Sequence, residues 1–264
     1  MERVADDGQQ RALDDEGGEG RPCSAGRADV LPAALSRTEF RRRIVETRRA
    51  GCRWKPDLYI VAVEGRRFVV KDYADKEFAF RWCVGRFSIG REISFYRRLQ
   101  GLPGIADVAY RIDRYAIAVS EIAGRNGAQV AVGELSEAFF LALREVIDSV
   151  HRCGVVLCDL RNIKNILLGD DGRPYLVDFC TAFSQGGRWN IVRRGLFRIF
   201  AQDDLLGIAK LKRERAPHLF SDADRQALAR GLFLERPARW LRDWGRQGLR
   251  FLFGWGKWTG SNAR

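Results

Sequence analysis

Apolar and polar residues alternate along two parts of the chain, and both parts predict antiparallel hairpins. Residues 57–63 (DLYIVAV) and 68–73 (FVVKDY) are separated by the polar turn 64–67 (EGRR), which is the pattern of two strands and a tight connection. Residues 107–122 alternate in the same way around a turn at Asp113-Arg114. These four strands predict a small antiparallel sheet in the first half of the chain.

Three segments repeat their apolar residues with the spacing of a helix face. Residues 32–50 predict a short amphipathic helix with a serine or threonine near its start as the cap, and residues 90–99 predict a second helix. The clearest pattern covers residues 134–152 and predicts a third. The apolar positions of the first are Leu35, Phe40, Ile44 and Val45, and those of the third are Leu135, Phe139, Phe140, Leu143, Val146, Ile147 and Val150.

Between residues 151 and 183 the pattern changes to short apolar runs, each next to a polar side chain. The polar residues at these strand ends are Asp159, Asn165 and Asp178, and the turn 169–172 (GDDG) predicts that two of the runs form a hairpin. Two carboxylates and one amide are thereby expected on one side of the hairpin. Such hard oxygen ligands suit Mg²⁺ that bridges substrate phosphates, an ion that needs only one or two protein carboxylates.

This stretch resembles the catalytic core of the protein-kinase-like superfamily. Asp159-Leu160-Arg161 followed by Asn165 is similar to the kinase catalytic loop, and Val177-Asp178-Phe179 is similar to its metal-binding motif. The sequence His151-x-x-Gly154-Val155 precedes them in the expected order. We interpret His151 itself as a structural histidine at a helix end, because it lies too far from Asp159 along the chain for a catalytic role to follow from spacing.

The stretch also departs from the kinase pattern. Leu157 and Cys158 stand where most protein kinases carry His and Arg, and Cys180 replaces the glycine after Phe179. The asparagine comes six residues after the aspartate (165 − 159), one residue later than in most protein kinases. Such variants are familiar in small bacterial kinases related to lipopolysaccharide-core (Kdo or heptose) kinases and, more distantly, in RIO-type kinases.

The resemblance implies a bilobal α+β fold, with a small antiparallel N-lobe sheet and a mainly helical C-lobe, and it implies ATP and Mg²⁺ as cofactors. Asp159 would orient the acceptor hydroxyl and accept its proton, and Arg161 would offset charge near the transferred group. Asn165 and Asp178 would hold Mg²⁺.

The resemblance also implies a nucleotide site in the N-lobe. Lys71 would position the phosphates and Glu92, 21 residues later (92 − 71), would hold that lysine, with Glu77 as a poorer competitor. Taken alone, Lys71 fits a solvated strand lysine better. The backbone of Glu121 and Ala123 would bond the adenine. No glycine-rich loop precedes the lysine, and we do not place the phosphate-binding loop, although the turn at 50–54 offers backbone amides.

Composition sets apart a tail (1–28), and the resemblance implies an N-lobe (29–122) and a C-lobe (123–264). The tail holds almost no large apolar residue, which predicts disorder. Residues 185–264 carry 17 Lys/Arg and 7 Asp/Glu, a net charge of +10 (17 − 7). Within them, residues 237–258 combine tryptophans with arginines, which is typical of a helix at a membrane surface and equally of a C-lobe helix whose aromatic residues form core.

Net charge and cysteine usage bound the partners and the compartment. The net charge of +12 favours anionic partners: a nucleotide, a phospholipid headgroup, lipopolysaccharide or nucleic acid. Six cysteines without a C-x-x-C pair, and only two histidines, argue against a zinc site. Scattered cysteines fit reduced, buried thiols, which predicts a cytoplasmic protein. A peripheral position on the inner face of the cytoplasmic membrane is a further expectation, because a lipid-linked acceptor would lie there. No signal-peptide pattern and no membrane-spanning apolar run are present in the sequence.

These observations predict an ATP-dependent phosphotransferase that acts on a hydroxyl. The preferred acceptor is a sugar of lipopolysaccharide core or a similar glycolipid, by analogy and because the C-terminal third is basic and aromatic. A RIO-like serine/threonine kinase that uses the basic surface for RNA is one alternative, although nucleic acid is the less favoured partner. A non-catalytic nucleotide-binding module and a kinase for another small molecule are the others.

Overall fold

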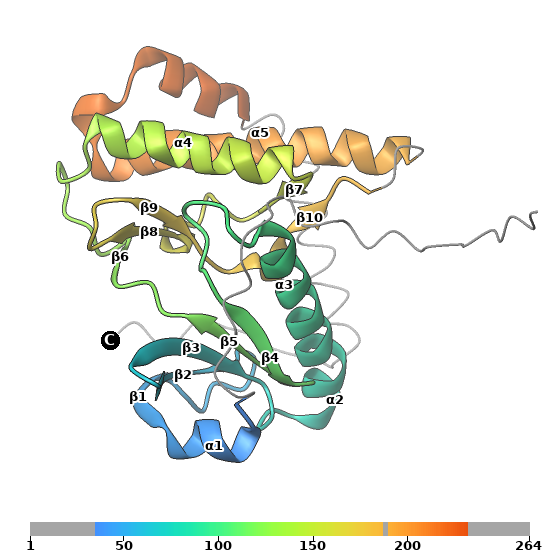
Figure 1. The fold of residues 1–264 in the computed structure, drawn as a ribbon. Coiled ribbons are helices and arrows are strands. Elements are labelled where there is room, and N and C mark those ends of the chain that lie inside the picture. Colours follow the sequence, from blue (N-terminus) through green and yellow to red (C-terminus); the bar gives the residue numbers. More distant parts are fainter. Residues whose placement is uncertain (1–34, 187–189, 232–264) are drawn as a thin grey trace, which may run out of the picture.

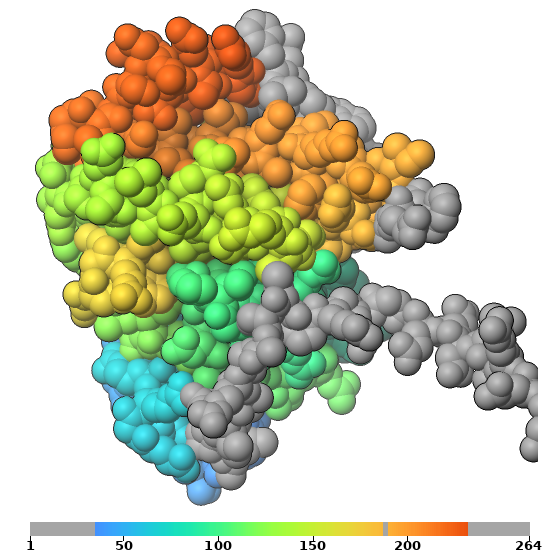
Figure 2. Space-filling model, turned by 45° about the horizontal axis from the view of Figure 1, so that its top comes forward, coloured from blue at the N-terminus to red at the C-terminus, as the bar shows by residue number. Residues whose placement is uncertain are grey.

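The computed structural model describes residues 35–186 and 190–231. A sheet and its flanking helices form one end of the protein, and long helices form the other (Figure 1). The space-filling view shows the same division, with the blue and cyan sheet residues at one end and the orange and red helical residues at the other (Figure 2). The predictions for residues 1–28 and 237–258 lie outside the described residues.

The first half of the chain forms a five-stranded sheet in the order β1-β2-β3-β5-β4. The strands are β1 (Ile44–Arg49), β2 (Asp57–Val63), β3 (Arg66–Asp72), β4 (Ala109–Asp113) and β5 (Ala116–Ser120). All neighbouring strands are antiparallel, and β2 and β3 pair without a register shift from Asp57↔Asp72 to Val63↔Arg66. Both hairpins predicted from alternation are therefore confirmed.

The helix predicted over residues 32–50 is shorter than expected. Helix α1 covers Arg37–Arg42, where Ser36 caps it in a reciprocal capping box with Glu39. Ile44 and Val45, which we had counted on its apolar face, instead begin strand β1. Both residues are β-branched, so they favour the extended backbone that pairs with β2.

A helical segment packs against the sheet from one side (Figure 1). It consists of α2 (Phe78–Phe80), one π-helical turn η1 (Arg81–Gly85) and α3 (Arg86–Leu99), so the helix predicted at 90–99 begins earlier. Its buried side chains include Ile89, Ile93 and Leu99. Gly85 lies directly against Tyr73, where a Cβ would come within 2.9 Å of that side chain, so glycine permits the close approach.

The second half of the chain is organised by helices α4 (Glu137–Arg152) and α5 (Ile191–Arg215), which lie side by side. Its strands are β6 (Gly124–Asn126), β8 (Ile166–Gly169) and β9 (Pro174–Leu176) in one sheet, and β7 (Val155–Val156) with β10 (Phe183–Ser184) in another. Three short 3-10 helices lie between or after these elements: η2 (Ile163–Asn165), η3 (Phe179–Thr181) and η4 (Pro217–Leu219). Residues 222–231 are helical. The predicted helix at 134–152 and the hairpin around 169–172 are confirmed.

The largest hydrophobic cluster joins the two halves. It runs from α3 through α4 to the strands around the predicted catalytic loop. Tyr96 of α3 meets Phe179 of η3 edge to face, with 4.8 Å between ring centroids. The helix beside the sheet is therefore packed directly onto the segment that carries Asp178. None of the described helices combines the length and the apolar character that a bilayer-spanning segment needs.

The cysteines differ from the expectation of buried, reduced thiols. Cys52, Cys83, Cys158 and Cys180 are free, but Cys83 is exposed on the helix beside the sheet. Cys153, at the end of α4, is disulfide-bonded. The spacing of cysteines along the chain did not predict either outcome, because exposure and pairing depend on which elements come together in the fold.

Candidate active site

A cavity of about 730 Å³ lies between the sheet and the short strands of the second half. Five of the predicted site residues line it: Lys71, Glu92, Glu121, Asn165 and Asp178. Asp159, Arg161 and Ala123 do not. The fold thus brings together residues that are more than 100 positions apart, since the Lys71 and Asp178 side chains are hydrogen-bonded at a separation of 107.

Lys71 is the centre of the polar side of this cavity. Its Nζ lies 2.6 Å from Glu92 Oε1 and 3.0 Å from Asp178 Oδ1. β3 supplies the lysine, α3 supplies Glu92, and Asp178 follows β9, so three elements meet at one ammonium group. Glu77, the competing partner, pairs instead with Arg53. The ion pair between Lys71 and Glu92 is therefore present, whereas its role in binding nucleotide stays a prediction.

The charges of this group stabilise one another. Burial lowers the pKa of Lys71, but Glu92 and Asp178 oppose it, and the net result is a pKa well above the ordinary value. The charge of Lys71 holds the pKa of Asp178 below its usual range. Burial raises the pKa of the Cys180 thiol, which donates a hydrogen bond to Asp178. The cysteine that replaces the kinase glycine thus acts as a neutral donor to this carboxylate.

Asp178 and Cys158 have backbone conformations that are uncommon for residues with side chains. Their φ angles are +69° and +63°, in the left-handed region, and Glu64 in a hairpin turn is the only other non-glycine residue with positive φ in the described segments. Asp178 lines the cavity, and Cys158 directly precedes Asp159. Such conformations persist where surrounding contacts hold them, and they gather at functional sites.

Asp159 is partly exposed and contacts Asn165, which lines the cavity. The Asn165 side-chain amide donates to the Asp159 carbonyl at 3.1 Å and approaches its carboxylate at 3.4 Å. Asn165 is buried at the end of the short helix η2. The extra residue between Asp159 and Asn165 is accommodated by this 3-10 turn, so the later position of the asparagine does not separate the two side chains.

Arg161 is turned away from the cavity. Its guanidinium lies 3.5 Å from Asp203 of α5, and Lys210 donates to its carbonyl at 2.8 Å. Lys164, in the same loop, lines the cavity beside Asn165. The loop therefore presents a cation to the cavity, but from a residue that the sequence pattern did not single out.

Asp204 binds the backbone that directly precedes Asp159 in the predicted catalytic loop. It is fully buried on α5, and its two carboxylate oxygens accept from the N–H groups of Leu157 and Cys158 at 2.8 and 3.0 Å. His151 Nε2 lies 3.0 Å from the same carboxylate, which agrees with a structural histidine. Burial raises the pKa of Asp204, and the hydrogen bonds from His151 and the backbone counteract it. Sequence reasoning missed Asp204, because nothing near it along the chain indicates what it contacts.

The turn between β1 and β2 lies at the mouth of the cavity. The N–H of Gly51 donates to Asp57 at 3.0 Å, and Asp57 is held in turn by the buried Lys76 at 2.6 Å. Arg49 and Lys55, at the two ends of the turn, line the cavity. Cationic side chains thus occupy the region where a glycine-rich loop would offer backbone amides.

The opposite end of the cavity is formed where β5 leaves the sheet. Glu121 and Ile122 line the cavity, and the Glu121 N–H donates to the Arg67 carbonyl at 2.9 Å. Ala123 lines a neighbouring cavity of about 360 Å³, which shares Glu121 and Ile122 with the main cavity, and its carbonyl accepts from the Asp170 N–H. The contact of the Glu121 and Ala123 backbone with adenine stays a prediction.

The donor set fits Mg²⁺ and a nucleotide. The Asp178 carboxylate is 41% exposed toward the cavity, and Asn165 adds an amide oxygen nearby. One carboxylate and one amide are enough for an ion that keeps waters and takes its other ligands from phosphates. Apolar side chains of Leu58, Val69 and Leu167 line the same cavity and suit an aromatic base.

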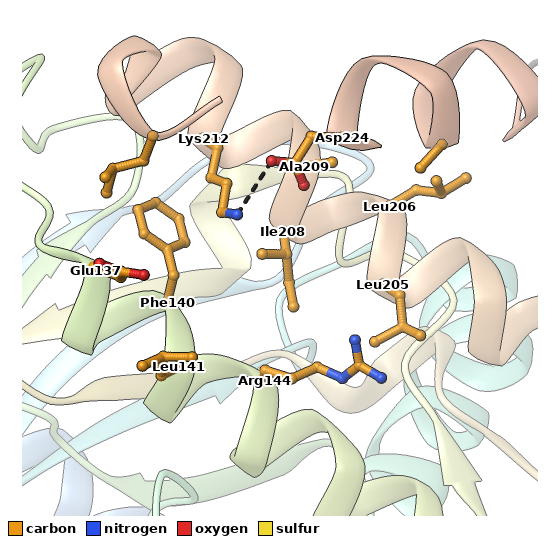
Figure 3. A pocket seen from close by; sticks show the side chains of 12 residues that line it. Glu137, Phe140, Leu141, Arg144, Leu205, Leu206, Ile208, Ala209, Lys212 and Asp224 are labelled. Atoms are coloured by element: carbon orange, nitrogen blue, oxygen red, sulfur yellow. Dashed lines mark hydrogen bonds and ion pairs between the residues drawn. The ribbon is translucent and has the colours of Figure 1, made fainter. Parts of the chain in front are cut away.

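A second cavity, of about 370 Å³, lies in the helical half between α4, α5 and residues 222–231 (Figure 3). Phe140, Ile208 and Ala209 form its apolar floor, and the ion pair between Lys212 and Asp224 crosses its edge at 3.1 Å. It contains none of the predicted site residues. The cavity between the two halves, which five of the predicted site residues line, is therefore the candidate active site.

No protein-family model and no curated protein matches this chain. Solved structures do resemble it. The Rio2 kinase–ADP/Mg²⁺–phosphoaspartate complex from Chaetomium thermophilum superposes with a TM-score of 0.51 at 20% sequence identity, over 71% of this chain and 63% of that one. A second Rio2 kinase structure from the same organism gives 0.51 at 18% identity, over 71% and 65%.

The fold is protein-kinase-like. The five-stranded antiparallel sheet and the helical second half agree with that fold, which confirms the α+β class predicted from sequence. The chain spans slightly less than two thirds of the length of the two Rio2 kinases. At these identities the similarity shows the fold, and it gives no support to the lipopolysaccharide-core subgroup named from the sequence motifs.

Proposed function

We propose that this protein is an ATP-dependent phosphotransferase that moves the γ-phosphoryl group to a hydroxyl. The observation that carries the proposal is the placement of Lys71 Nζ between Glu92 and Asp178, at 2.6 and 3.0 Å, inside a cavity that also contains Asn165. A lysine fixed by one carboxylate and facing a second carboxylate beside an amide is the arrangement that phosphoryl transfer needs.

In the proposed reaction the acceptor oxygen forms a bond to the γ-phosphorus, the bond to the bridging oxygen breaks, and ADP leaves. Asp159 orients the acceptor hydroxyl and takes its proton. Lys71 positions the phosphates, and Glu92 positions Lys71. Asn165 and Asp178 would hold Mg²⁺, which would offset the phosphate charge when bound.

Lys164 is the better candidate than Arg161 for the cation beside the transferred group. It lines the cavity next to Asn165, while the Arg161 guanidinium is engaged with Asp203 at 3.5 Å. Arg49 and Lys55 would bind phosphate oxygens from the β1–β2 turn. Three cations around one anionic substrate stabilise negative charge without a glycine-rich loop.

The acceptor is a separate question from the reaction. A lipopolysaccharide-core sugar was favoured from motif resemblance, and it stays a prediction. The two similar structures are Rio2 kinases, which favours the RIO-like serine/threonine alternative at the level of fold. We therefore propose a hydroxyl acceptor, with a protein side chain and a glycolipid sugar as the two classes to be tested.

A radiolabelled transfer assay decides between them. The full chain is incubated with labelled ATP and Mg²⁺ against lipopolysaccharide, free sugars and a general protein substrate in parallel, with Asp159→Asn as the control. We expect transfer to one class, and a loss of at least ~10²-fold in the variant. ATP binding without transfer to any class would favour the non-catalytic nucleotide-binding module instead.

A further inference from the structure

Three large aromatic side chains are exposed on the outer face of the helix beside the sheet. Phe78 is 68%, Trp82 is 54% and Phe87 is 64% exposed. They follow one another along α2, the π-turn η1 and the start of α3. The opposite face of this helix carries the buried core residues and Glu92, so it is already used by the fold. An exposed aromatic row of this kind indicates an interaction surface.

Each of these aromatic rings lies beneath a guanidinium group. The distances from guanidinium carbon to ring centroid are 5.7 Å for Arg81 on Phe78, 5.9 Å for Arg86 on Trp82 and 5.5 Å for Arg91 on Phe87. Residues 78–99 contain five arginines and a single acid, Glu92, which is buried against Lys71. Within residues 78–99 the outer face of the helix therefore has no carboxylate to compete for a bound anion, and Glu77 just before them pairs with Arg53.

The start of α5 has the same composition. Ile191 is 80% and Val192 is 74% exposed. They are followed by Arg193, Arg194 and Arg198, and no acid occurs before Asp203, which is buried. Two separate elements thus expose large apolar residues among arginines.

The segment 182–184 connects these two elements. Arg91 of α3 donates from Nε to the Ala182 carbonyl at 3.0 Å, and Arg193 of α5 donates from Nη2 to the Ser184 hydroxyl at 3.0 Å. Partial burial lowers the pKa of Arg91, and the nearby charge of Arg193 adds to the effect. In Figure 1 the α2–α3 helix and the beginning of α5 lie along the same edge of the molecule. We call their combined surface, formed by Phe78, Trp82, Phe87, Ile191, Val192 and the adjoining arginines, the arginine–aromatic face.

Exposed apolar residues are concentrated on this face. Among the described residues, eight large hydrophobic side chains are exposed, and five of them belong to the arginine–aromatic face. The other three are Val45, Val132 and Leu141, which lie on other elements. Most of the exposed large apolar side chains of the described residues are therefore on the two elements that the segment 182–184 connects.

We propose that the arginine–aromatic face binds the surface of an anionic phospholipid bilayer. Tryptophan and phenylalanine partition into the headgroup boundary, and arginines beside them pair with lipid phosphates. Single-stranded nucleic acid also attracts arginines and aromatic rings. Ile191 and Val192 decide between the two, because exposed aliphatic side chains gain by entering a bilayer and cannot stack on bases.

Docking through this face would bring the candidate active site to the membrane. Glu92, which holds Lys71, is on the other side of the same helix, and the segment 182–184 follows Asp178 by a few residues. This surface is distinct from residues 237–258, whose sequence fits a membrane-surface helix and a C-lobe core helix equally. Vesicle binding does not depend on phosphoryl transfer, so the proposal stands or fails independently of the proposed function.

The test is co-sedimentation of the full chain with vesicles of phosphatidylcholine, with or without phosphatidylglycerol. We expect binding to the anionic vesicles alone, and weaker binding at high salt. Two variants remove apolar contacts from the face: Phe78→Ser/Trp82→Ser/Phe87→Ser and Ile191→Ser/Val192→Ser. Each should partition at least about tenfold more weakly. The matched control is Val132→Ser/Leu141→Ser, whose residues are 63% and 62% exposed elsewhere and whose binding should equal that of the wild type.

Equal binding by the face variants and the wild type overturns the proposal, as does an equal loss in the control. Binding to poly(U) that is tighter than binding to vesicles, and is lost in the same variants, would assign the face to nucleic acid instead. A probe gives a second readout in folded protein. The exposed Cys83, next to Trp82, is labelled with an environment-sensitive fluorophore in a Cys52→Ser background. Its emission should shift to the blue with anionic vesicles, whereas a label at Val132→Cys in a Cys52→Ser/Cys83→Ser background should not respond.

Discussion

Glu92 and Asp204 are both buried carboxylates beside a basic side chain, but only Glu92 faces a cavity. Glu92 holds Lys71, whose side chain is 17% exposed and reaches Asp178 in the open cavity. Asp204 is completely enclosed, and its carboxylate contacts His151 and the backbone N–H groups of Leu157 and Cys158. The first cluster leaves charge available to a ligand, whereas the second has none left to offer.

This difference shows that a buried carboxylate beside a basic side chain can either prepare a binding site or stabilise the fold. A buried carboxylate whose acceptor capacity is filled by the protein mainly fixes geometry, here the left-handed backbone of Cys158. A carboxylate that fixes a partly exposed lysine next to a second carboxylate creates a site whose charges a substrate can use. Both acids are buried, so the feature that distinguishes the candidate active site from the Asp204 cluster is that Lys71, the partner of Glu92, reaches the open cavity.

The largest effect is expected from Asp178→Asn. The variant removes the partly exposed carboxylate that would hold Mg²⁺ beside Lys71, so Mg²⁺-dependent transfer should fall by at least ~10²-fold. The unfolding midpoint should change little, because the Asp178 side chain is 41% exposed. Parallel measurements of transfer and of thermal unfolding check both parts. Wild-type turnover in this variant would refute the kinase assignment.

Asp204→Ala should have the reverse profile. It leaves the N–H groups of Leu157 and Cys158 buried without an acceptor and His151 without its partner, so the free energy of unfolding should fall by about 3–5 kcal/mol. Urea denaturation measures it. Asp148→Ala is the control, since Asp148 pairs with Arg144 on the surface and its loss should cost about 0–1 kcal/mol. Similar losses in both variants would show that Asp204 is not the support described above.

We call Lys71, Glu92 and Asp178 the open cluster, and Asp204 with His151 the closed cluster. The sequence predicted the open cluster better than the closed cluster, for a physical reason. Lys71 lies in a strand defined by alternation, and the resemblance places Glu92 at a set distance along the chain, so local patterns were sufficient. Asp204 is 53 residues from His151, within a helix whose pattern gives no sign of its contacts. The predicted end of the first helix was wrong, because the positions of Ile44 and Val45 fit a helical period whereas their β-branched side chains favour a strand.

The cationic residues of the site show the same limit. Arg161 matched the motif by its position after Asp159, but its direction is determined by Asp203 of α5, which no local pattern reveals. Lys164, Arg49 and Lys55 reach the cavity only because a loop and a turn fold toward it. Motif spacing therefore identified the carboxylates and the lysine of the site, while the surrounding positive charge depended on tertiary structure.

An intermediate effect is expected from Lys164→Ala. Loss of a cation at the cavity should lower kcat by about 10–10²-fold, because its interaction strengthens as charge develops in the transition state. Arg161→Ala is the matched comparison from the same loop and should lower kcat less, with its main effect on stability through Asp203. Steady-state kinetics of both variants with the acceptor found by the transfer assay gives the answer. A larger kcat loss in Arg161→Ala would restore the assignment made from the motif.

The smallest effect concerns the titration of Asp178. The charge of Lys71 is the main cause of its lowered pKa, so the ionised carboxylate contributes stability above the pKa of unfolded aspartate, and this contribution is lost as pH falls through the lower folded value. In Lys71→Met the Asp178 carboxylate loses this partner, and its pKa should rise. Carboxyl carbon NMR of Asp178 follows the midpoint directly, and Lys164→Met serves as the control that removes a more distant positive charge. The stability difference between the wild type and Lys71→Met should accordingly shrink on acidification. An unchanged Asp178 midpoint in Lys71→Met would mean that the two side chains do not pair in solution, and the open cluster would then reduce to Lys71 and Glu92.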